Sequence, residues 1–323
     1  MTEITITVLK SLREITQTEW DACACPEKIN GKRAIDPFTT YRFLNALEQS
    51  QSIGAGTGWI TCHLLAKIGS KIIGILPLYV KSHSQGEYIF DYAWANAYEQ
   101  AGGRYYPKLQ SSIPFTPVTG KRFLVKQGFE REGREALVSG LKSFGEQNKI
   151  SSSHITFCTK EEVAELSDTE LLLRETIQFH WEDNNFTDFE GFLNSLSSRK
   201  RKAIKRERKI ANGFGGKQGN IFPLTGDEIT SSHWDFFWQF YQDTGKRKWG
   251  TPYLTRNFFD LVHQTMRNDI LLVLAFNRDT PIAGALNFIG QNSLFGRYWG
   301  ASEDHSCLHY ELCYYQAIDF ALS

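Results

Sequence analysis

Two stretches of the sequence repeat one pattern of three apolar runs, and this repeat limits the possible folds more than any other feature. The first copy reads LAK, a turn, IIGILPLYV, a turn and YIFDYAWA; the second reads LAF, a turn, PIAGALNFI, a turn and LFGRYWGA. Gly74 aligns with Gly284, and Trp94 with Trp299. Chance similarity of short runs is the alternative. Because a helical region precedes each copy and a helix follows it, we predict two α/β units rather than one large sheet.

The remaining elements follow from apolar periodicity and from Gly, Pro and Asp signals. In the first half we expect strands at 4–10, 56–68, 71–81, 87–95 and 152–158, and helices at 16–23, 39–50, 131–148 and 160–172. In the second half we expect helices at 187–211, 231–243, 255–267 and 308–322, and strands at 271–276, 281–289 and 293–301. The long aperiodic stretch 96–123 is predicted to be an ordered, functional loop. We place a domain boundary near residue 180, which gives domains of 1–180 and 181–323.

Composition agrees with a globular protein that has a β-containing core. Hydrophobic residues make up 41% of the 323 residues, charged residues 22% and aromatic residues 14%. Aromatic side chains favour strands and stacked pockets. The longest apolar runs, 72–80 and 271–276, are too short to span a bilayer, and the N-terminus lacks the pattern of a signal peptide. We therefore expect a cytoplasmic protein without a membrane span.

The cysteines do not indicate a metal site or a disulfide framework. The chain has six of them, at positions 23, 25, 62, 158, 307 and 313, without a CxxC pair or the Cys/His spacing of a zinc site. We expect free thiols that are buried or idle, and no bound metal.

The charge balance is even over the chain but uneven along it. The sequence has 36 basic and 36 acidic residues, yet the segment 199–209 (RKRKAIKRERK) alone holds eight basic residues and one acidic residue. The balance over the whole chain disfavours a dedicated nucleic-acid coat protein. The basic segment itself is a candidate for docking an anionic ligand.

The end of the third run in the second copy resembles a phosphate-binding motif. Three strands that lead into a helix are typical of the acyl-CoA N-acetyltransferases of the GNAT superfamily, whose pyrophosphate loop reads Gln/Arg-x-x-Gly-x-Gly/Ala. Arg297, Gly300, Ala301 and Ser302 fit this pattern except for the serine. Backbone N–H groups at a strand-to-helix turn attract phosphate, and Gly300 would allow close approach. The alternative is an aromatic core strand that ends in a glycine turn.

A wider resemblance covers nearly the whole chain in order. The segments that carry it are 94–109, 114–124, 178–181, 192–208, 252–259, 281–286 and 296–321. They resemble the bacterial FemAB-like family of peptidoglycan biosynthesis/recognition proteins. The resemblance implies an α/β fold of two GNAT-like lobes, each with a mixed, mainly antiparallel sheet flanked by helices. Members of that family continue with a strand and a Gly-Ala-Gln-Gly-Glu-His-Lys motif, so we expect this chain to lack that segment and its second lobe to be truncated.

The same resemblance implies an acyltransferase that moves an acyl or aminoacyl group onto an amine. The acceptor would be a small molecule or peptide, such as a cell-wall precursor, and the donor would be acyl-CoA or, alternatively, aminoacyl-tRNA. A second hypothesis is a non-catalytic recognition module that binds a phosphate-bearing ligand or nucleic acid through the basic segment.

Three groups of residues are candidates for substrate binding and catalysis. In the long loop, Tyr105, Tyr106 and Lys108 offer two rings and an ammonium to a sugar or peptide acceptor; the alternative is a loop pinned by its tyrosines. In the basic segment, the residues that would bind the phosphates of a nucleotide-linked precursor or a tRNA are Lys200, Arg201, Lys205 and Arg206. One alternative is a solvated helix face. Another is general nucleic-acid binding, although the segment lacks the stacking aromatic residues of a single-strand binder. The candidate bases for amine acylation are Asp304, His309 and Glu311, each of which is otherwise a cap or helix-face residue.

Overall fold

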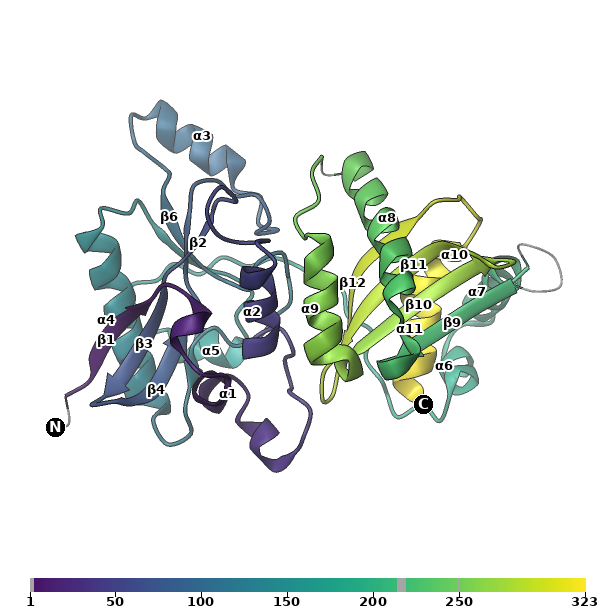
Figure 1. Cartoon of the computed structure of the whole chain (residues 1–323), viewed down its shortest axis with the longest axis horizontal. Coiled ribbons are helices and arrows are strands. Elements are labelled where there is room, and N and C mark those ends of the chain that lie inside the picture. The colour runs from purple at the N-terminus through teal and green to yellow at the C-terminus, as the bar shows by residue number, and fades with distance from the viewer. Residues whose placement is uncertain (1–2, 214–218, 249) are drawn as a thin grey trace. The chain divides into compact units, whose positions relative to one another are not determined.

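A computed structural model describes residues 3–213, 219–248 and 250–323 of the chain. The chain forms two compact units (Figure 1). Unit 1 comprises Met1–Leu173 with Tyr253–Phe258, and unit 2 comprises Arg174–Pro252 with Phe259–Ser323. Each unit is built on mainly antiparallel sheet flanked by helices, which confirms the predicted fold class. Within the described ranges, no helix combines the length and apolar character needed to cross a bilayer.

The sheet of unit 1 consists of two four-stranded parts. One part has the order β1-β3-β4-β7, formed by Thr5–Leu9, His63–Ile68, Lys71–Leu76 and Leu124–Val125. The other has the order β2-β5-β6-β8, formed by Trp59–Thr61, Tyr79–Lys81, Lys108–Ser111 and Ser153–Ile155. All neighbours are antiparallel except β6 and β8, which are parallel.

A short irregularity separates the two parts along the chain. Cys62 interrupts β2 and β3, and Pro77-Leu78 interrupts β4 and β5. Proline cannot donate to a sheet ladder, so a break at this point is expected. The Cys62 N–H still donates to the Leu78 carbonyl at 2.9 Å, and the Leu78 N–H donates to His63 Nδ1 at 2.9 Å. These bonds hold the two parts together.

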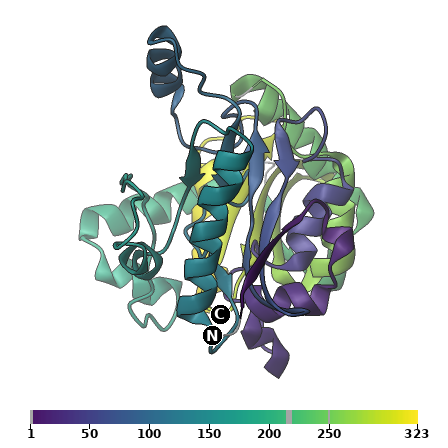
Figure 2. The ribbon, with the colours of Figure 1, turned by 90° about the vertical axis from the view of Figure 1, so that its left-hand side faces the viewer.

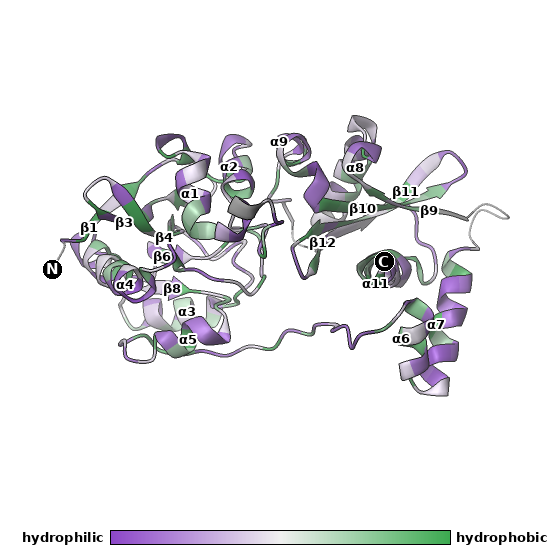
Figure 3. Cartoon of the chain, turned by 90° about the horizontal axis from the view of Figure 1, so that it is seen from below, coloured by the Kyte–Doolittle hydropathy of each residue, from purple (hydrophilic) through white to green (hydrophobic). Residues whose placement is uncertain are grey.

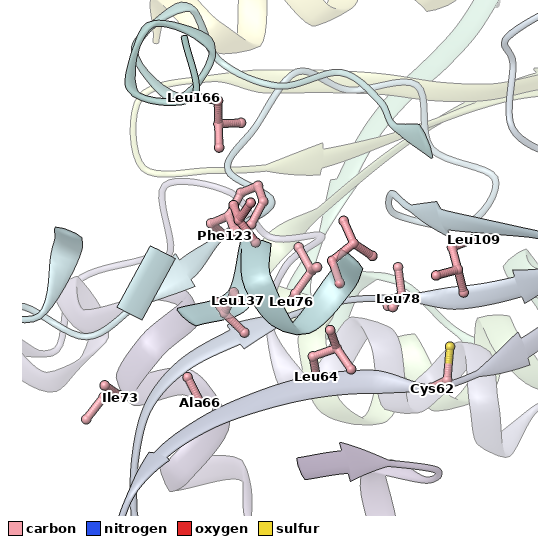
Figure 4. Packing of buried hydrophobic residues seen from close by; sticks show 12 residues of the cluster. Cys62, Leu64, Ala66, Ile73, Leu76, Leu78, Leu109, Phe123, Leu137 and Leu166 are labelled. Carbon is pink, nitrogen blue, oxygen red and sulfur yellow. The ribbon is translucent and has the colours of Figure 1, made fainter. Parts of the chain in front are cut away.

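Helices cover the sheet of unit 1. They are α1 (Gln17–Ala24), α2 (Tyr41–Gln49), α3 (Tyr92–Gln100), α4 (Glu130–Gln147) and α5 (Lys160–Glu165), with short 3-10 turns at Leu12–Glu14 and Pro26–Asn30. The side chains of α4 pack on the strands through a buried apolar cluster that includes Leu64, Leu76, Leu137 and Leu141 (Figure 4). In contrast, α3 projects from the rest of unit 1 (Figure 1, Figure 2).

The predicted strand at 87–95 is wrong. Residues 92–100 form α3, and the next strand after β5 is β6, which pairs with β5. The helix contains Ala93, Ala95 and Ala97, and alanine is the strongest helix former, so local propensity outweighs the preference of the aromatic residues for strands. The proposed match of Trp94 with Trp299 is therefore wrong as well, because Trp94 lies on a helix and Trp299 in a strand.

Unit 2 contains one four-stranded antiparallel sheet with the order β12-β11-β10-β9. The strands are β9 (Gly219–Thr225), β10 (Ile270–Asn277), β11 (Thr280–Ile289) and β12 (Leu294–Ala301). The last three form the predicted meander, whereas β9 was not predicted. A 3-10 turn at Gly226–Glu228 follows β9, and another at Arg267–Asp269 precedes β10.

The helices of this half are α6 (Phe189–Ser195), α7 (Ser198–Ala211), α8 (Ser231–Lys248), α9 (Arg256–Met266) and a last helix that runs as α10 (Leu308–Tyr310), a π-helical turn η5 (Glu311–Tyr315) and α11 (Gln316–Leu322). The α8 helix and the last helix lie on opposite faces of the sheet (Figure 3). The predicted single helix at 187–211 is two helices, because Ser197 is the N-cap of α7 and its hydroxyl accepts the Lys200 N–H.

Candidate functional site

One face of the unit 1 sheet carries an unusual row of buried lysines. The register pairs Trp59 with Lys81 across β2 and β5, and Lys81 with Lys108 across β5 and β6. Directly paired residues point to the same face of a sheet, so these three side chains lie in one row. Both lysine side chains are fully buried. Because lysine is almost never buried without a partner, this row requires anionic neighbours.

The segment between β5 and β6 supplies those neighbours. Lys108 Nζ donates to Glu87 Oε2 at 2.7 Å, to Asp91 Oδ2 at 2.6 Å and to Ser84 Oγ at 2.8 Å. Lys81 Nζ lies 4.0 Å from Glu87 Oε1 and 3.7 Å from the centre of the Trp59 ring. We call Lys81, Glu87, Asp91 and Lys108 the buried charge cluster.

Two oxygen atoms of the buried charge cluster lack a hydrogen bond. Glu87 Oε1 and Asp91 Oδ1 are buried and accept none within the described part of the chain. A buried acceptor without a partner costs about 1–3 kcal/mol. Each carboxylate therefore keeps one buried oxygen that can still accept a hydrogen bond.

Burial changes the protonation of this cluster. Desolvation, helped by the nearby Lys108 ammonium and opposed by Glu87, lowers the pKa of Lys81 to about 7. Desolvation raises the pKa of Glu87 despite its contact with Lys108. Burial alone would raise the pKa of Asp91, but hydrogen bonds from Lys108, Ser84 and Tyr105 hold it below its ordinary value. Lys81 can therefore give or take a proton near neutral pH.

Aromatic side chains form the wall beside the cluster. The Trp59 ring contacts Phe115 at 5.5 Å, and Phe115 stacks on Tyr253 at 5.0 Å with an interplanar angle of 8°. Gly86 lies under this wall with φ of +80°, and a Cβ there would be 2.6 Å from the Phe115 ring. The glycine thus lets the chain carrying Glu87 pass close beneath the rings.

The structure brings together the predicted acceptor residues Tyr105, Tyr106 and Lys108. The Tyr105 hydroxyl donates to Asp91 Oδ2 at 2.8 Å, and the Tyr106 hydroxyl is 2.8 Å from Ser84 Oγ. Tyr105 therefore contacts the buried charge cluster directly, Lys108 is a member of it, and Tyr106 contacts Ser84, which accepts a hydrogen bond from Lys108. Sequence reasoning missed Lys81, Glu87 and Asp91. The signal was the presence of charged residues inside runs that otherwise read as apolar strands, where a charge needs a specific partner.

The predicted donor motif of unit 2 lies mostly inside a strand. Arg297, Gly300 and Ala301 belong to β12, and the Ser302 N–H donates to the Ile282 carbonyl at 2.8 Å. Gly300 is buried: a Cβ there would be 2.3 Å from the carbonyl oxygen of Phe240 in α8. The missing side chain of Gly300 therefore makes room for α8. The last helix begins at Leu308 without a side-chain cap, and the Leu308 N–H donates to the His305 carbonyl at 3.2 Å.

The candidate bases of unit 2 occupy different environments. Glu311 is fully buried and pairs with Arg208 Nη2 at 3.1 Å, and Gln316 Nε2 donates to it at 2.8 Å. Asp304 is exposed in the turn before the helix. His309 is exposed and its ring contacts Trp299 at 5.1 Å.

The basic segment forms α7, and its residues divide between exposed and anchored ones. Lys200, Lys205 and Arg206 are exposed, and Arg201 is half-buried. Arg201 donates to Asn194 at 2.9 Å, and Lys205 pairs with Glu190 at 2.6 Å. Most of the segment therefore faces solvent, while Arg208 fixes it to Glu311 and Asp319 of the last helix.

The cysteines are all free, as predicted. Burial raises the pKa of Cys23 to about 11 and that of Cys62 and Cys158 to about 12, so these thiols are poor nucleophiles near neutral pH. In the described ranges, no group of three His, Cys, Asp or Glu side chains is placed to hold a metal ion.

The fold and the site define an α/β protein with two sheet-based units and a buried charge cluster in the first. The chain belongs to the FemAB-like family, described as peptidoglycan biosynthesis/recognition, which it matches over residues 11–323. No protein of curated function matches its sequence.

The solved structures that are similar to this chain include the following two. A conserved protein of unknown function from Bacteroides thetaiotaomicron VPI-5482 is 12% identical, with a TM-score of 0.52 over 97% of this chain and 86% of that one. The crystal structure of FemX is also 12% identical, with a TM-score of 0.47 over 95% of this chain and 82% of that one. The first likeness shows that the fold has been seen before.

Proposed function

We propose that this protein transfers an acyl or aminoacyl group onto an amine of a peptidoglycan precursor, with the acceptor bound in unit 1. Membership of the FemAB-like family supports the class of acceptor. The observation that carries the proposal is the pair of unsatisfied carboxylate oxygens, Glu87 Oε1 and Asp91 Oδ1, beside Lys81. Carboxylates attract an ammonium group, and the pKa of Lys81 near 7 suits a proton acceptor.

The chemistry follows from the nature of an amine nucleophile. The acceptor ammonium must lose a proton before its nitrogen attacks the donor carbonyl. A new C–N bond then forms and the bond from the carbonyl carbon to the donor sulfur or oxygen breaks. Neutral Lys81 would take the proton, while Glu87 and Asp91 hold the amine. In unit 2, His309 and Asp304 are the exposed alternatives as bases, whereas Glu311 is buried, with its Oε1 paired to Arg208 and its Oε2 without a hydrogen bond in the described part of the chain.

The donor is either acyl-CoA or aminoacyl-tRNA, and both carry phosphates. Two features of unit 2 support a phosphate-bearing donor: the uncapped start of the last helix after Ser302, and the exposed basic side chains of α7. The same basic side chains also favour the second candidate function, recognition of a phosphate-bearing ligand without catalysis.

A transfer assay separates these proposals. The protein is incubated with a soluble UDP-linked muramoyl peptide and either acetyl-CoA or charged tRNA, and the product is identified by mass spectrometry. We expect a mass increase on the peptide amine with one donor, and at least a tenfold loss of rate in Glu87→Gln. A rate that Lys81→Met leaves intact but His309→Ala abolishes would move the base to unit 2. Ligand binding with neither donor producing a mass change would favour recognition alone.

A further inference from the structure

Unit 2 begins with a segment that has the sequence pattern of a strand but no partner strand. Residues 176–182 (TIQFHWE) alternate polar and apolar side chains, which is typical of a strand with one buried face. In the structure, residues 171–184 form neither helix nor strand. Ile177 and Phe179 are 81% and 95% exposed. Because apolar side chains gain free energy when they leave water, this side of the segment favours a partner surface.

The same segment is negatively charged. Residues 174–190, which we call the acidic segment, hold five acidic residues and one basic residue: Glu175, Glu182, Asp183, Asp188 and Glu190 against Arg174. Glu175 and Glu182 lie on either side of the apolar positions, and both are exposed. Neither of them forms an ion pair within the described ranges. A complementary surface would therefore be basic with an apolar part.

The outer side of α7 has this character. Positions three or four apart lie on one side of a helix, so four basic residues of α7 form one row, which we call the basic row: Arg199, Lys202, Arg206 and Lys209. All four are exposed, and none of them forms an ion pair in the part of the chain that the structure describes. Ile210 lies on the same side and is 40% exposed. The opposite side of α7 carries Arg208 and faces the last helix.

Contacts within unit 2 leave both surfaces uncovered. The Trp181 ring packs edge-on against Phe192 of α6, with 5.7 Å between the ring centres, and this contact holds the acidic segment against that helix. The α6 helix in turn packs beside α7 through Ile204 (Figure 3). Glu190 pairs at 2.6 Å with Lys205, a residue outside the basic row. The basic row and the apolar side of the acidic segment remain exposed.

A second copy of this chain fits both surfaces at once. A nucleic acid would match the basic row, but the acidic segment would repel it, and Ile177 and Phe179 would stay in water. Each copy of the chain offers one acidic segment and one basic row. Two copies can therefore meet about a two-fold axis, with the acidic segment of each copy on the basic row of the other. Both contacts then form together, and the apolar side chains leave water.

We propose that this protein forms a two-fold symmetric homodimer through unit 2. Glu175 and Glu182 of each copy would pair with the basic row of the other copy, and Ile177 and Phe179 would pack beside Ile210. The proposal does not depend on the proposed function, because neither the buried charge cluster nor a donor takes part in the contact.

Sedimentation velocity of the full chain tests this proposal. At low ionic strength and about 100 µM protein we expect a dimer with twice the 37.0 kDa mass of one chain, and dimerisation at least tenfold weaker at high salt, because salt screens exposed charges. Three double variants are compared with the wild type: Lys202→Glu/Lys209→Glu in the basic row, Glu175→Lys/Glu182→Lys in the acidic segment, and Lys10→Glu/Lys121→Glu as a control at exposed positions of unit 1. We expect at least tenfold weaker dimerisation for each of the first two variants and wild-type dimerisation for the control. Circular dichroism checks that each variant is folded.

Charge exchange between copies gives the sharpest test. An equimolar mixture of the two reversed variants should form a mixed dimer, and a chain with all four substitutions should dimerise again, because both sides of each contact then carry opposite charges. A wild type that stays monomeric under these conditions, or a dimer that both reversed variants leave intact, would overturn the proposal, and so would the failure of both exchange experiments. Because no acyl transfer is measured, the dimer can fail while the proposed function stands, and the reverse.

Discussion

In both units a strand pairs antiparallel with the next strand along the chain, β5 with β6 in unit 1 and β11 with β12 in unit 2, but the connections between the paired strands differ in length. In unit 2, four residues, 290–293, join β11 to β12, and the Gly290 N–H closes the turn on the Ser293 carbonyl at 2.8 Å. In unit 1, residues 82–107 join β5 to β6 and carry Glu87, Asp91 and α3. The charged residues Glu87 and Asp91 therefore lie on a long connection, while the strands that it joins pair antiparallel as they do in unit 2.

The residues that lie opposite each other across these paired strands also differ between the units. Lys81 lies opposite Lys108 in unit 1, whereas Gly284 lies opposite Gly300 in unit 2. A Cβ at Gly284 would be 2.9 Å from the Phe237 ring of α8, so both glycines make room for this helix. The face in unit 1 therefore holds charged side chains, whereas the face in unit 2 is covered by the packed helix α8.

The largest expected effect is on the charged face. Replacement of Lys108 by Met leaves the Glu87 and Asp91 carboxylates buried without their cation, and we expect a loss of about 3–5 kcal/mol in the free energy of unfolding. Urea denaturation followed by circular dichroism measures it. Lys142→Met is the matched control, because Lys142 pairs with Glu170 at 3.0 Å on the surface, and its stability should not change. Equal effects of the two variants would show that the cluster is not a structural unit.

The packed face is tested at Gly300. We expect Gly300→Val to destabilise the protein by about 3 kcal/mol, because its side chain would collide with the backbone of Phe240. Gly296→Val in the same strand is the control, since it is exposed and its Cβ would be 3.4 Å from Asn287 Oδ1. Thermal unfolding compares them. A stable Gly300→Val protein that loses donor binding would restore the donor-loop interpretation.

Much of the fold could be predicted because apolar runs with clear turns form β10, β11 and β12. The strand β6 was missed because Lys108 and Gln110 are polar yet fully buried, which a hydrophobic pattern does not reveal. The strand β9 was missed because it contains Pro223, which is tolerated in a strand at the sheet edge.

The candidate site also could be predicted only in part from local sequence patterns. Tyr105, Tyr106 and Lys108 were found because they stand together in the sequence. Glu311 was selected as a base from its place near a helix start, but its environment is set by Arg208, 103 residues away. Such a long-range ion pair leaves no local signal in the sequence. The aligned glycines Gly74 and Gly284 also face different helices, Gly74 facing α4 through Leu137 and Gly284 facing α8.

A separate effect concerns the dependence of stability on pH. The pKa of Lys81 is about 7 in the folded state, below its ordinary value of 10.5, so the unfolded chain binds more protons between these values. This group therefore makes stability rise with pH from about 7 to 10.5, by up to about 1.4 kcal/mol per pH unit. Unfolding of wild type and Lys81→Met across this range measures the difference. Parallel curves for the two proteins would contradict a lowered pKa.

The smallest expected effect on stability is at α7, in which Lys200 and Arg206 are exposed. Reversal of both to Glu should leave the melting temperature nearly unchanged. Binding of a phosphate-bearing donor should fall at least tenfold, and wild-type binding should weaken steeply with salt. Filter binding with charged tRNA and calorimetry with acetyl-CoA measure this. Binding that depends on neither salt nor these charges would leave α7 as a solvated surface.

The most direct test of the central claim, that unit 1 holds a proton-accepting amine site, is the titration of Lys81 itself. Lysine side chains are labelled with ¹⁵N, and the Nζ resonance missing in Lys81→Met is followed from pH 5 to 11 with and without the muramoyl peptide. The account predicts a midpoint near 7 that shifts when the peptide binds. A midpoint near 10.5 that the peptide leaves unchanged would contradict it.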